Sequence, residues 1–335
     1  MNVMVCGGAG FIGANLIATL LNNSSADLIV FDRLSYASHP KAIELLQNHK
    51  RITFFQKDIG DKDFILSTLR SYQPDIVINL AAETHVDNSI RYPDIFIKNN
   101  VNAFHGLLEA CRDYLNSTNN VPDTSFRFIH VSKDEVFGPI PHEVAAANEQ
   151  TAYRPANPYS ATKAASDHLV SAYENTFGFP ANILYLSNNY GPYQHFEKLI
   201  PKIINSALNN RAIPIYGDGT QRRTWLNVKD TCEGILKVIE RGKTGERYNL
   251  GSVDEIQNLD LANEICKLLD QIRPMSGQQR YQSLITFVQD RPGHDFRYSL
   301  DCKKSFNDLC WEPKIPIQRG LFETIKWYVD QRSKS

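Results

Sequence analysis

A glycine-rich turn after the first apolar run constrains the fold of this chain more than any other feature. Residues Asn2–Cys6 are typical of a short buried strand, and Gly7, Gly10 and Gly13 follow at the spacing G-x-x-G-x-x-G before a helical pattern begins. Such glycines permit a tight turn, a close approach of the backbone to a pyrophosphate, and a helix N-terminus aimed at its charge. A tight turn without a ligand is the alternative. It is disfavoured because Asp32 ends the second apolar run, about 20 residues on, as a dinucleotide fingerprint requires.

Two acidic positions refine this prediction. A carboxylate at Asp32 would bond the ribose 2′-hydroxyl and repel a 2′-phosphate, which favours NAD over NADP, although the neighbouring Arg33 leaves the choice open. Asp58 follows the third apolar run, where it could accept from the adenine amino group or cap a helix.

Short apolar runs alternate with helical patterns through the first half of the chain, which indicates parallel β-α-β units. The predicted strands are Asn2–Cys6, Leu28–Phe31, Ile52–Gln56, Asp75–Leu80, Arg127–Ser132 and Ala181–Leu186, with Arg247–Leu250 rejoining them later. The polar stretch Asn116–Ser125 reads as a solvated insertion. We predict an α/β protein with a Rossmann-type, doubly wound parallel sheet. Residues 1–188 and 229–255 would form the NAD-binding domain, and 189–228 and 256–335 a smaller α/β lobe for substrate.

Composition excludes several other classes of protein. Thirty-six Lys and Arg balance 37 Asp and Glu, so no basic field favours nucleic acid. The six cysteines form no CxxC pair and no metal-ligand pattern, so we expect reduced thiols, no metal and a cytoplasmic protein. No apolar run approaches the roughly 18 residues of a membrane span, and the N-terminus does not resemble a signal peptide.

Tyr159 and Lys163 form a Y-x-x-x-K pair. Residues four apart share a helix face, so the ammonium would lie near the phenol and lower its pKa. A phenol so activated can take a proton from an alcohol while hydride leaves for NAD. A surface Tyr and Lys would be the ordinary explanation of this pair, but the glycine turn upstream favours catalysis.

The fifth predicted strand leads into Lys133, Asp134 and Glu135. Two neighbouring carboxyl groups at the carboxyl end of a strand suit an elimination, because one can take a proton from carbon while the other protonates a departing hydroxyl. Taken alone, a solvated acidic turn would explain this pair better.

These motifs together resemble the extended short-chain dehydrogenases/reductases, most closely the dTDP-glucose 4,6-dehydratases. The similar segments span Gly7 to about Tyr328, and the most specific are AAETHVD at 81–87, NNYGPY at 188–193 and DRPGHD at 290–295. The resemblance implies a dehydratase acting on a nucleotide-diphosphate hexose. Tyr159 would deprotonate the C4 hydroxyl, hydride would pass to a tightly held NAD, Glu135 would take the C5 proton, Asp134 would protonate the leaving C6 hydroxyl, and hydride would return to C6.

The resemblance also implies binding residues. Those for NAD are Gly7, Gly10, Phe11, Ile12, Gly13, Asp32, Leu34, Asp58, Ile59, Leu80, Ala81, Ala82, Asn100, Tyr159 and Lys163. Those for the nucleotide sugar are Thr84, His85, Asn189, Glu197, Lys198, Leu199, Tyr216, Arg223, Arg291 and His294, although a structural role is the simpler expectation for both histidines. A homodimer is implied, with helices around Asn100–Leu115 and Tyr159–Phe177 paired across the interface.

Lys133 departs from the family pattern, which usually has Thr before the Asp-Glu pair. An ammonium cannot accept a hydrogen bond. Lys133 could shift the Tyr159 pKa further, contact an anionic group of a different sugar, or point elsewhere. Thr224, where the family often has Asp, is a lesser departure. A UDP- or GDP-hexose dehydratase, a 4-epimerase or other sugar-modifying relative, and a non-catalytic NAD- or nucleotide-sugar-binding protein therefore stay open, although epimerases do not need the acidic pair.

Overall fold

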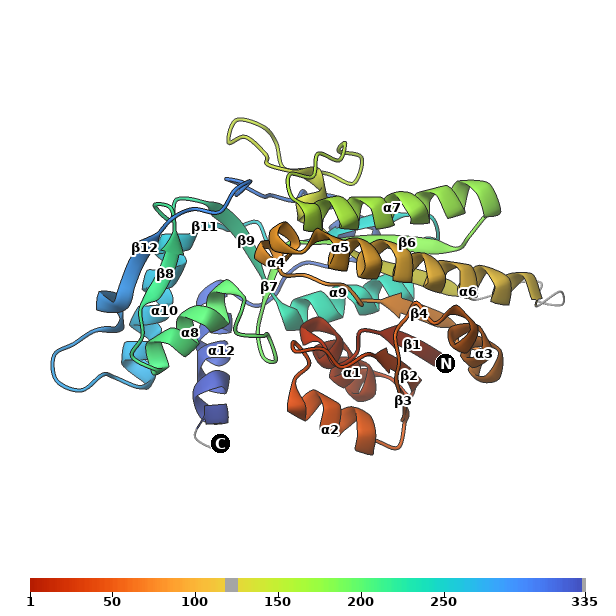
Figure 1. The fold of residues 1–335 in the computed structure, drawn as a ribbon, viewed down its shortest axis with the longest axis horizontal. Helices are drawn as coiled ribbons and strands as arrows, with labels where there is room; N and C mark the ends of the chain where they lie inside the picture. Colours follow the sequence, from red (N-terminus) through yellow and green to blue (C-terminus); the bar gives the residue numbers. More distant parts are fainter. Residues whose placement is uncertain (118–125, 333–335) are drawn as a thin grey trace.

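A seven-stranded parallel sheet forms the centre of the computed structural model, which describes residues 1–117 and 126–332 (Figure 1). Its strands are β1 (Asn2–Cys6), β2 (Asp27–Asp32), β3 (Ile52–Gln56), β4 (Ile76–Asn79), β5 (Arg127–Lys133), β6 (Ala181–Leu186) and β10 (Arg247–Leu250). They lie in the order β10-β6-β5-β4-β1-β2-β3. The predicted doubly wound sheet is confirmed, including the return of β10 beside β6. The order reverses between β1 and β4, where folds of this type bind their ligands.

Alternate residues of the strands support the two faces of the sheet. Met4 and Cys6 pack in one apolar core, whereas Val3 and Val5 pack in a second core on the opposite face. This is the period-two pattern of a strand buried on both sides. The first core includes α3 (Lys62–Tyr72), α6 (Phe104–Ser117) and α7 (Pro158–Phe177). The second includes α1 (Phe11–Asn23), α2 (Pro40–Asn48) and α9 (Val228–Arg241).

Short helical segments lie at the carboxyl ends of β4 and β5. Helices α4 (Val86–Arg91) and α5 (Pro93–Phe96) follow β4 and lead into a π-helix, Ile97–Ala103, that continues as α6. A 3₁₀ turn, Asp134–Phe137, follows β5. π-Helical turns often mark functional sites. The segment 118–125, which holds most of the predicted solvated insertion, lies outside the described residues.

A smaller lobe with its own apolar core lies to one side of the sheet (Figure 1). Its elements are β7 (Asn188–Tyr190), α8 (Leu199–Leu208), β8 (Ile213–Tyr216), β9 (Arg222–Asn227), β11 (Glu255–Gln257), α10 (Asn258–Ile272), a 3₁₀ turn (Tyr281–Leu284), β12 (Ile285–Val288) and α12 (Ile317–Arg332). Helix α11 (Lys303–Leu309) instead packs against α9 and β10 in the second core of the sheet. Strands β7, β9 and β11 form one small sheet, and β8 and β12 another. The domain boundaries given above stay a prediction. Within the described ranges, no helix has both the length and the apolar character to span a bilayer.

Candidate active site

One pocket of about 440 Å³ extends from the glycine turn to the smaller lobe. Nearly all predicted site residues line it, from both the sheet and the lobe. They are Gly7, Gly10, Phe11, Ile12, Gly13, Asp32, Asp58, Ile59, Leu80, Ala81, Ala82, Thr84, His85, Lys133, Glu135, Tyr159, Lys163, Asn189, Glu197, Lys198, Leu199, Tyr216, Arg223, Arg291 and His294. Leu34, Asn100 and Asp134 do not line it. No cluster of potential metal ligands occurs among the residues that the structure describes.

The glycine turn fits a dinucleotide pyrophosphate. A Cβ on Gly13 would lie 2.1 Å from the Gly7 carbonyl oxygen, and one on Gly7 would lie 2.7 Å from the Ala81 nitrogen. The turn therefore packs directly on the start of α1 and on the end of β4. Gly10 is the N-cap of α1 and adds no side chain. The first backbone N–H groups of such a helix have no partner within the helix and can bind an anion.

Asp32 and Arg33 are held in a way that suits NAD. The Asp32 carboxylate accepts from the backbone nitrogens of Ala9 (2.9 Å) and Leu34 (2.8 Å). Each of its oxygens keeps lone-pair capacity for a ribose hydroxyl. The Arg33 guanidinium bonds the Glu83 carboxylate, and the Asp58 carboxylate lies 3.8 Å away. Arg33 is thereby neutralised by carboxylates rather than free to attract a 2′-phosphate.

Three predicted cofactor residues have local roles in the structure. Leu34, at a φ of 59°, supplies a backbone donor to Asp32. Asn100 is buried and holds the Glu83 backbone through bonds of 2.7 and 3.0 Å, so it shapes the pocket wall from behind. Asp58 lines the pocket, and helix α3 is capped by Asp61 instead.

Helix α7 presents the predicted catalytic pair. Pro158 starts the helix, and Asn157 and Ser160 cap it reciprocally. This fixes the first turn, so Tyr159 and Lys163 lie one turn apart, both lining the pocket and only 6% and 4% exposed.

The electrostatics of this pair differ from the prediction. The Lys163 ammonium donates to the Val131 carbonyl at 2.9 Å. Burial raises the pKa of the Tyr159 phenol well above its usual range, and the carboxylates of Glu135 and Asp134 add to that shift. The predicted lowering of the Tyr159 pKa by Lys163 is therefore wrong, because desolvation disfavours the phenolate. Burial also lowers the pKa of Lys163, to about 8.

A buried polar network behind Lys163 was missed by sequence reasoning. His130 Nε2 lies 3.5 Å from Lys163 Nζ and 3.2 Å from the Asp167 carboxylate. Ser132 donates to the same carboxylate at 2.6 Å. Burial and the charge of Lys163 together lower the pKa of His130 to about 4, against the opposing effect of Asp167. Asp167 lies one turn beyond Lys163 on α7, a spacing that could have signalled it.

The two carboxyl groups after β5 differ in their access to the pocket. Glu135 lines the pocket, and its Oε2 is buried without a hydrogen-bond partner within the described chain. Asp134 is 2% exposed and bonds Lys133 Nζ at 2.7 Å. Burial raises the pKa of Asp134, against the opposing charge of Lys133. The expectation that both carboxyl groups face the pocket is thus met by Glu135 alone.

Arg223 and Asn189, both predicted to bind substrate, are also structural. Arg223 donates to the backbone oxygens of Arg222 (2.7 Å), Phe296 (3.0 Å) and Asp295 (2.7 Å), and it stacks over Tyr298 at 4.3 Å. This fixes its guanidinium at the pocket wall. Asn189 donates to the Ser187 carbonyl at 2.9 Å and accepts from Thr231.

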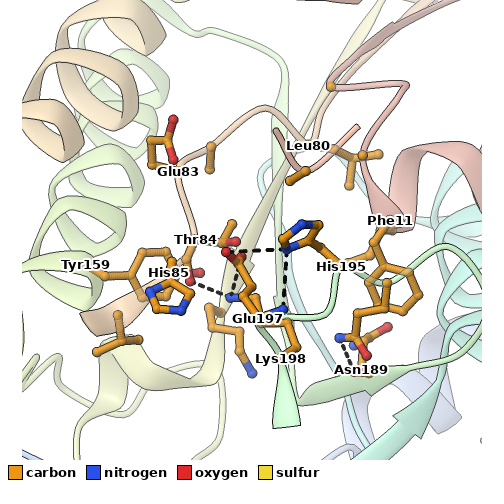
Figure 2. Close-up of a pocket in the computed structure, with 18 of the residues that line it drawn as sticks. Phe11, Leu80, Glu83, Thr84, His85, Tyr159, Asn189, His195, Glu197 and Lys198 are labelled. Atoms are coloured by element: carbon orange, nitrogen blue, oxygen red, sulfur yellow. Dashed lines mark hydrogen bonds and ion pairs between the residues drawn. The ribbon is translucent and has the colours of Figure 1, made fainter. Parts of the chain in front are cut away.

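The segment before α8 brings charged side chains into the pocket (Figure 2). Lys198 donates to the Thr84 carbonyl at 2.6 Å, which joins the smaller lobe to the segment after β4. Burial alone would raise the pKa of Glu197, but the hydrogen bond from His195 and the charge of Lys198 lower it to about 2. His195 was not predicted, since no motif marks it.

Both predicted histidines and Tyr216 are held by hydrogen bonds, which is the structural role expected for the histidines. His85 caps α4 through its ring, and the His294 ring lies 2.6 Å from the Asp290 carboxylate. The Tyr216 hydroxyl donates to Asp87 at 2.9 Å. Arg291 lies 3.7 Å from Asp87, and its Nε has no hydrogen-bond partner within the described ranges.

Known proteins are similar to this chain in sequence and fold over nearly their whole length. The family model described as GDP-mannose 4,6 dehydratase matches residues 4–324. The chain is 44% identical to the dTDP-glucose 4,6-dehydratase of Haemophilus influenzae, with 100% of each chain covered. It superposes with a TM-score of 0.89 and 35% identity on DesIV, the dTDP-glucose 4,6-dehydratase of Streptomyces venezuelae solved with NAD and TYD bound, covering 100% of this chain and 98% of that one. It also resembles a UDP-glucose 4-epimerase of Thermotoga maritima, at a TM-score of 0.85 and 25% identity, with 99% and 100% covered.

Proposed function

This chain belongs to the extended short-chain dehydrogenase/reductase family, in the group of nucleotide-sugar 4,6-dehydratases, and we propose that it converts dTDP-glucose to dTDP-4-keto-6-deoxyglucose with NAD as cofactor. The observation that carries the proposal is that Tyr159 and Glu135 line one pocket, which is continuous with the glycine turn. An alcohol base and a carbon base facing the same space suit oxidation at C4 followed by elimination across C5 and C6.

NAD bound at the glycine turn would accept hydride from C4, return hydride to C6, and add a positive ring charge that favours the Tyr159 phenolate.

The protein groups then move protons at three atoms. Tyr159 takes the proton of the C4 hydroxyl, helped by Lys163 one helical turn away. The resulting 4-ketone acidifies the C5 proton, and the unpartnered Glu135 Oε2 is placed to accept it. The leaving C6 oxygen needs a proton, and Asp134, whose pKa is raised by burial, is the acid that the family pattern suggests.

The charged side chains of the smaller lobe suit the nucleotide diphosphate. Arg223, Arg291 and Lys198 line that end of the pocket. Guanidinium forks and ammonium groups are the usual partners of phosphate oxygens. The choice of thymine and glucose is supported by the names of the relatives, which are dTDP-glucose 4,6-dehydratases.

A 4-epimerase is the second candidate, favoured by the fold it shares with the UDP-glucose 4-epimerase. Epimerisation has no use for a carbon base such as Glu135. The test is a panel of dTDP-, UDP- and GDP-hexoses, with and without an acetamido group, read by mass. Loss of one water with formation of a ketone is the expected result for dTDP-glucose. An isomer of unchanged mass would establish the epimerase, and NAD binding without turnover would establish a binding protein.

We further propose a homodimer in the cytoplasm. Phe177 at the end of α7 is 50% exposed, and Tyr92, Ile95 and Ile97, in and beside α5 and ahead of α6, are 59%, 47% and 48% exposed. Covering such a surface with the same surface of a second copy would bury them. Light scattering should give twice the mass of the chain, and a monomer at micromolar concentration would contradict the dimer.

A further inference from the structure

The Lys163 side chain is buried with a charge that its surroundings must balance. It lies at the pocket wall, and its ammonium donates to the Val131 carbonyl at 2.9 Å. Lysine is almost never fully buried unless it is paired. A carbonyl dipole offsets only part of the cost of removing a full charge from water, so a carboxylate is expected close by.

Asp167 is a carboxylate on the same face of α7. It lies four residues beyond Lys163, and residues at this spacing are neighbours on a helix surface. It is fully buried. Ser132 donates to its Oδ2 at 2.6 Å, and His130 Nε2 lies 3.2 Å from its Oδ1. Two side chains of β5 thus hold the carboxylate at one place and supply it with hydrogen-bond donors.

The contacts of His130 fix which of its ring nitrogens carries the proton. Asn79 on β4 is paired in register with His130, and its Oδ1 accepts from the Ala81 backbone nitrogen at 3.2 Å. Its amide nitrogen therefore faces His130 Nδ1, 3.3 Å away, and that ring nitrogen accepts. The proton of the neutral ring is then on Nε2, where it can be donated to the Asp167 carboxylate.

A neutral imidazole leaves the charge of Asp167 uncancelled. A protonated His130 would oppose that charge and would repel the Lys163 ammonium 3.5 Å away. Burial and the charge of Lys163 keep the pKa of His130 at about 4, so the ring is neutral at neutral pH. Tyr185 on β6 and Tyr153 ahead of α7 also interact with Asp167. Burial raises the pKa of both phenols above the usual range, so they stay neutral too.

The charge of Asp167 acts on both members of the catalytic pair. Burial lowers the pKa of Lys163 to about 8, and the charge of Asp167 opposes this shift. Burial raises the pKa of the Tyr159 phenol, and the two carboxylates after β5 and then Asp167 add to that effect. Removing the negative charge of Asp167 would therefore lower both pKa values.

We propose that Asp167 is the buried counter-charge that keeps the Lys163 ammonium charged beside Tyr159, and that it is thereby a positioning residue for the reaction. This inference rests on the proposed function, because it concerns the pair that would deprotonate the C4 hydroxyl. A nearby cation favours a phenolate, so a neutral Lys163 could not help Tyr159 to take a proton. Asp167 thus sets the pH range in which the pair works.

The first test compares the pH profile of turnover with dTDP-glucose between wild type and Asp167→Asn. The amide keeps the shape of the carboxylate, its oxygen can accept from His130, and the Ser132 hydroxyl can turn to accept from its nitrogen. Both limbs of the profile should move to lower pH by about 1–2 pH units, so turnover lost at high pH should return as the pH falls. Asp167→Ser, a second neutral variant, should move the profile in the same direction.

A direct titration makes the second test independent of turnover. In protein labelled with ¹³C at the lysine ε-carbons, the Lys163 signal is the one that disappears in Lys163→Met. This signal should titrate at a lower pH in both neutral variants than in wild type. Asp230→Asn is the matched control, because Asp230 is also buried but lies on α9 and accepts from the Ile315 backbone nitrogen at 3.0 Å. It should change neither the profile nor the titration.

The proposal is overturned if the neutral variants lower turnover equally at every pH, or if Lys163 titrates in them as it does in wild type. Melting temperature and retained NAD, compared with wild type, show that each variant is folded. Wild type is assayed first. If it does not turn over dTDP-glucose and Lys163 still titrates at a lower pH in Asp167→Asn, the counter-charge is supported and the proposed function has failed.

Discussion

The two ends of the pocket are built by different means. At the glycine turn, the backbone forms the site, and Gly7 and Gly13 pack so closely that no side chain would fit. At the smaller lobe, long charged side chains such as Lys198 and Arg291 form it, from segments far apart in sequence. The first kind of site is specified by a short motif, whereas the second depends on which charges the fold brings together.

The largest expected effect is on turnover, at Tyr159, where the two ends of the pocket meet. Tyr159→Phe removes the proton acceptor and little volume, so turnover should fall by about 10²–10⁴-fold while NAD and nucleotide sugar still bind. Turnover and both binding constants should be measured on one preparation. If turnover stays near wild type, another group deprotonates C4.

Substitution in the glycine turn should weaken NAD binding more than substrate binding. An alanine Cβ at Gly13 would meet the Gly7 carbonyl oxygen at 2.1 Å, so the turn must shift, at a cost of about 1–3 kcal/mol in stability and about 10–100-fold in NAD affinity.

Gly10→Ala is the matched variant. Its Cβ would meet protein only at 3.5 Å, an ordinary contact, so the protein should keep its stability and lose NAD affinity alone. Calorimetry with NAD, together with melting curves, separates the two effects. Unchanged NAD affinity in both variants would remove the glycine turn from the cofactor site.

Substitution at the charged end should weaken binding of the nucleotide sugar and leave NAD binding unchanged. Arg291→Gln removes a cation from the pocket wall, and KM for dTDP-glucose should rise about 10–100-fold with NAD affinity unchanged. Arg319→Gln, on an arginine side chain 73% exposed on α12, is the control and should change neither value. An Arg291→Gln enzyme with normal KM would show that the diphosphate lies elsewhere.

An effect on stability alone, and not on binding or turnover, is expected from one buried histidine near each end. Burial lowers the pKa of His130 and of His294 to about 4. Between the ordinary histidine pKa of about 6.5 and pH 4, the unfolded chain binds more protons, so the free energy of unfolding should fall as pH falls, by up to about 3 kcal/mol for each. Denaturant unfolding across this range should show the slope. It should be shallower in His130→Gln and in His294→Gln, but not in His105→Gln, whose ring is exposed. If neither substitution changes the slope, the pH dependence of the free energy of unfolding comes from other groups.

Sequence reasoning predicted the short-range features well. The strands and the glycine turn follow from apolar periodicity and local spacing, and β10 was placed correctly because Arg247–Leu250 has the same buried pattern as the central strands. It did less well with electrostatics. The Tyr159 pKa shift was predicted in the wrong direction, because a Y-x-x-x-K spacing says nothing about burial. The helical spacing could have signalled Asp167, but its contact with His130 joins α7 to β5, and that pairing has no local pattern.

Lys133 shows the same limit. The sequence places it beside Asp134, but only the packing of β6 and β7 brings Leu186 and Asn188 to its ammonium. The hydrogen bonds of Lys133 therefore could not be predicted from its neighbours in the chain.

Elimination across C5 and C6 is tested most directly by running the wild-type reaction on dTDP-glucose in D₂O and locating deuterium in the product. The account predicts a product that has lost one water and carries one solvent deuterium at C5, where Glu135 exchanges the proton. A product that keeps its original hydrogen at C5, or an isomer that has lost no water, would contradict it.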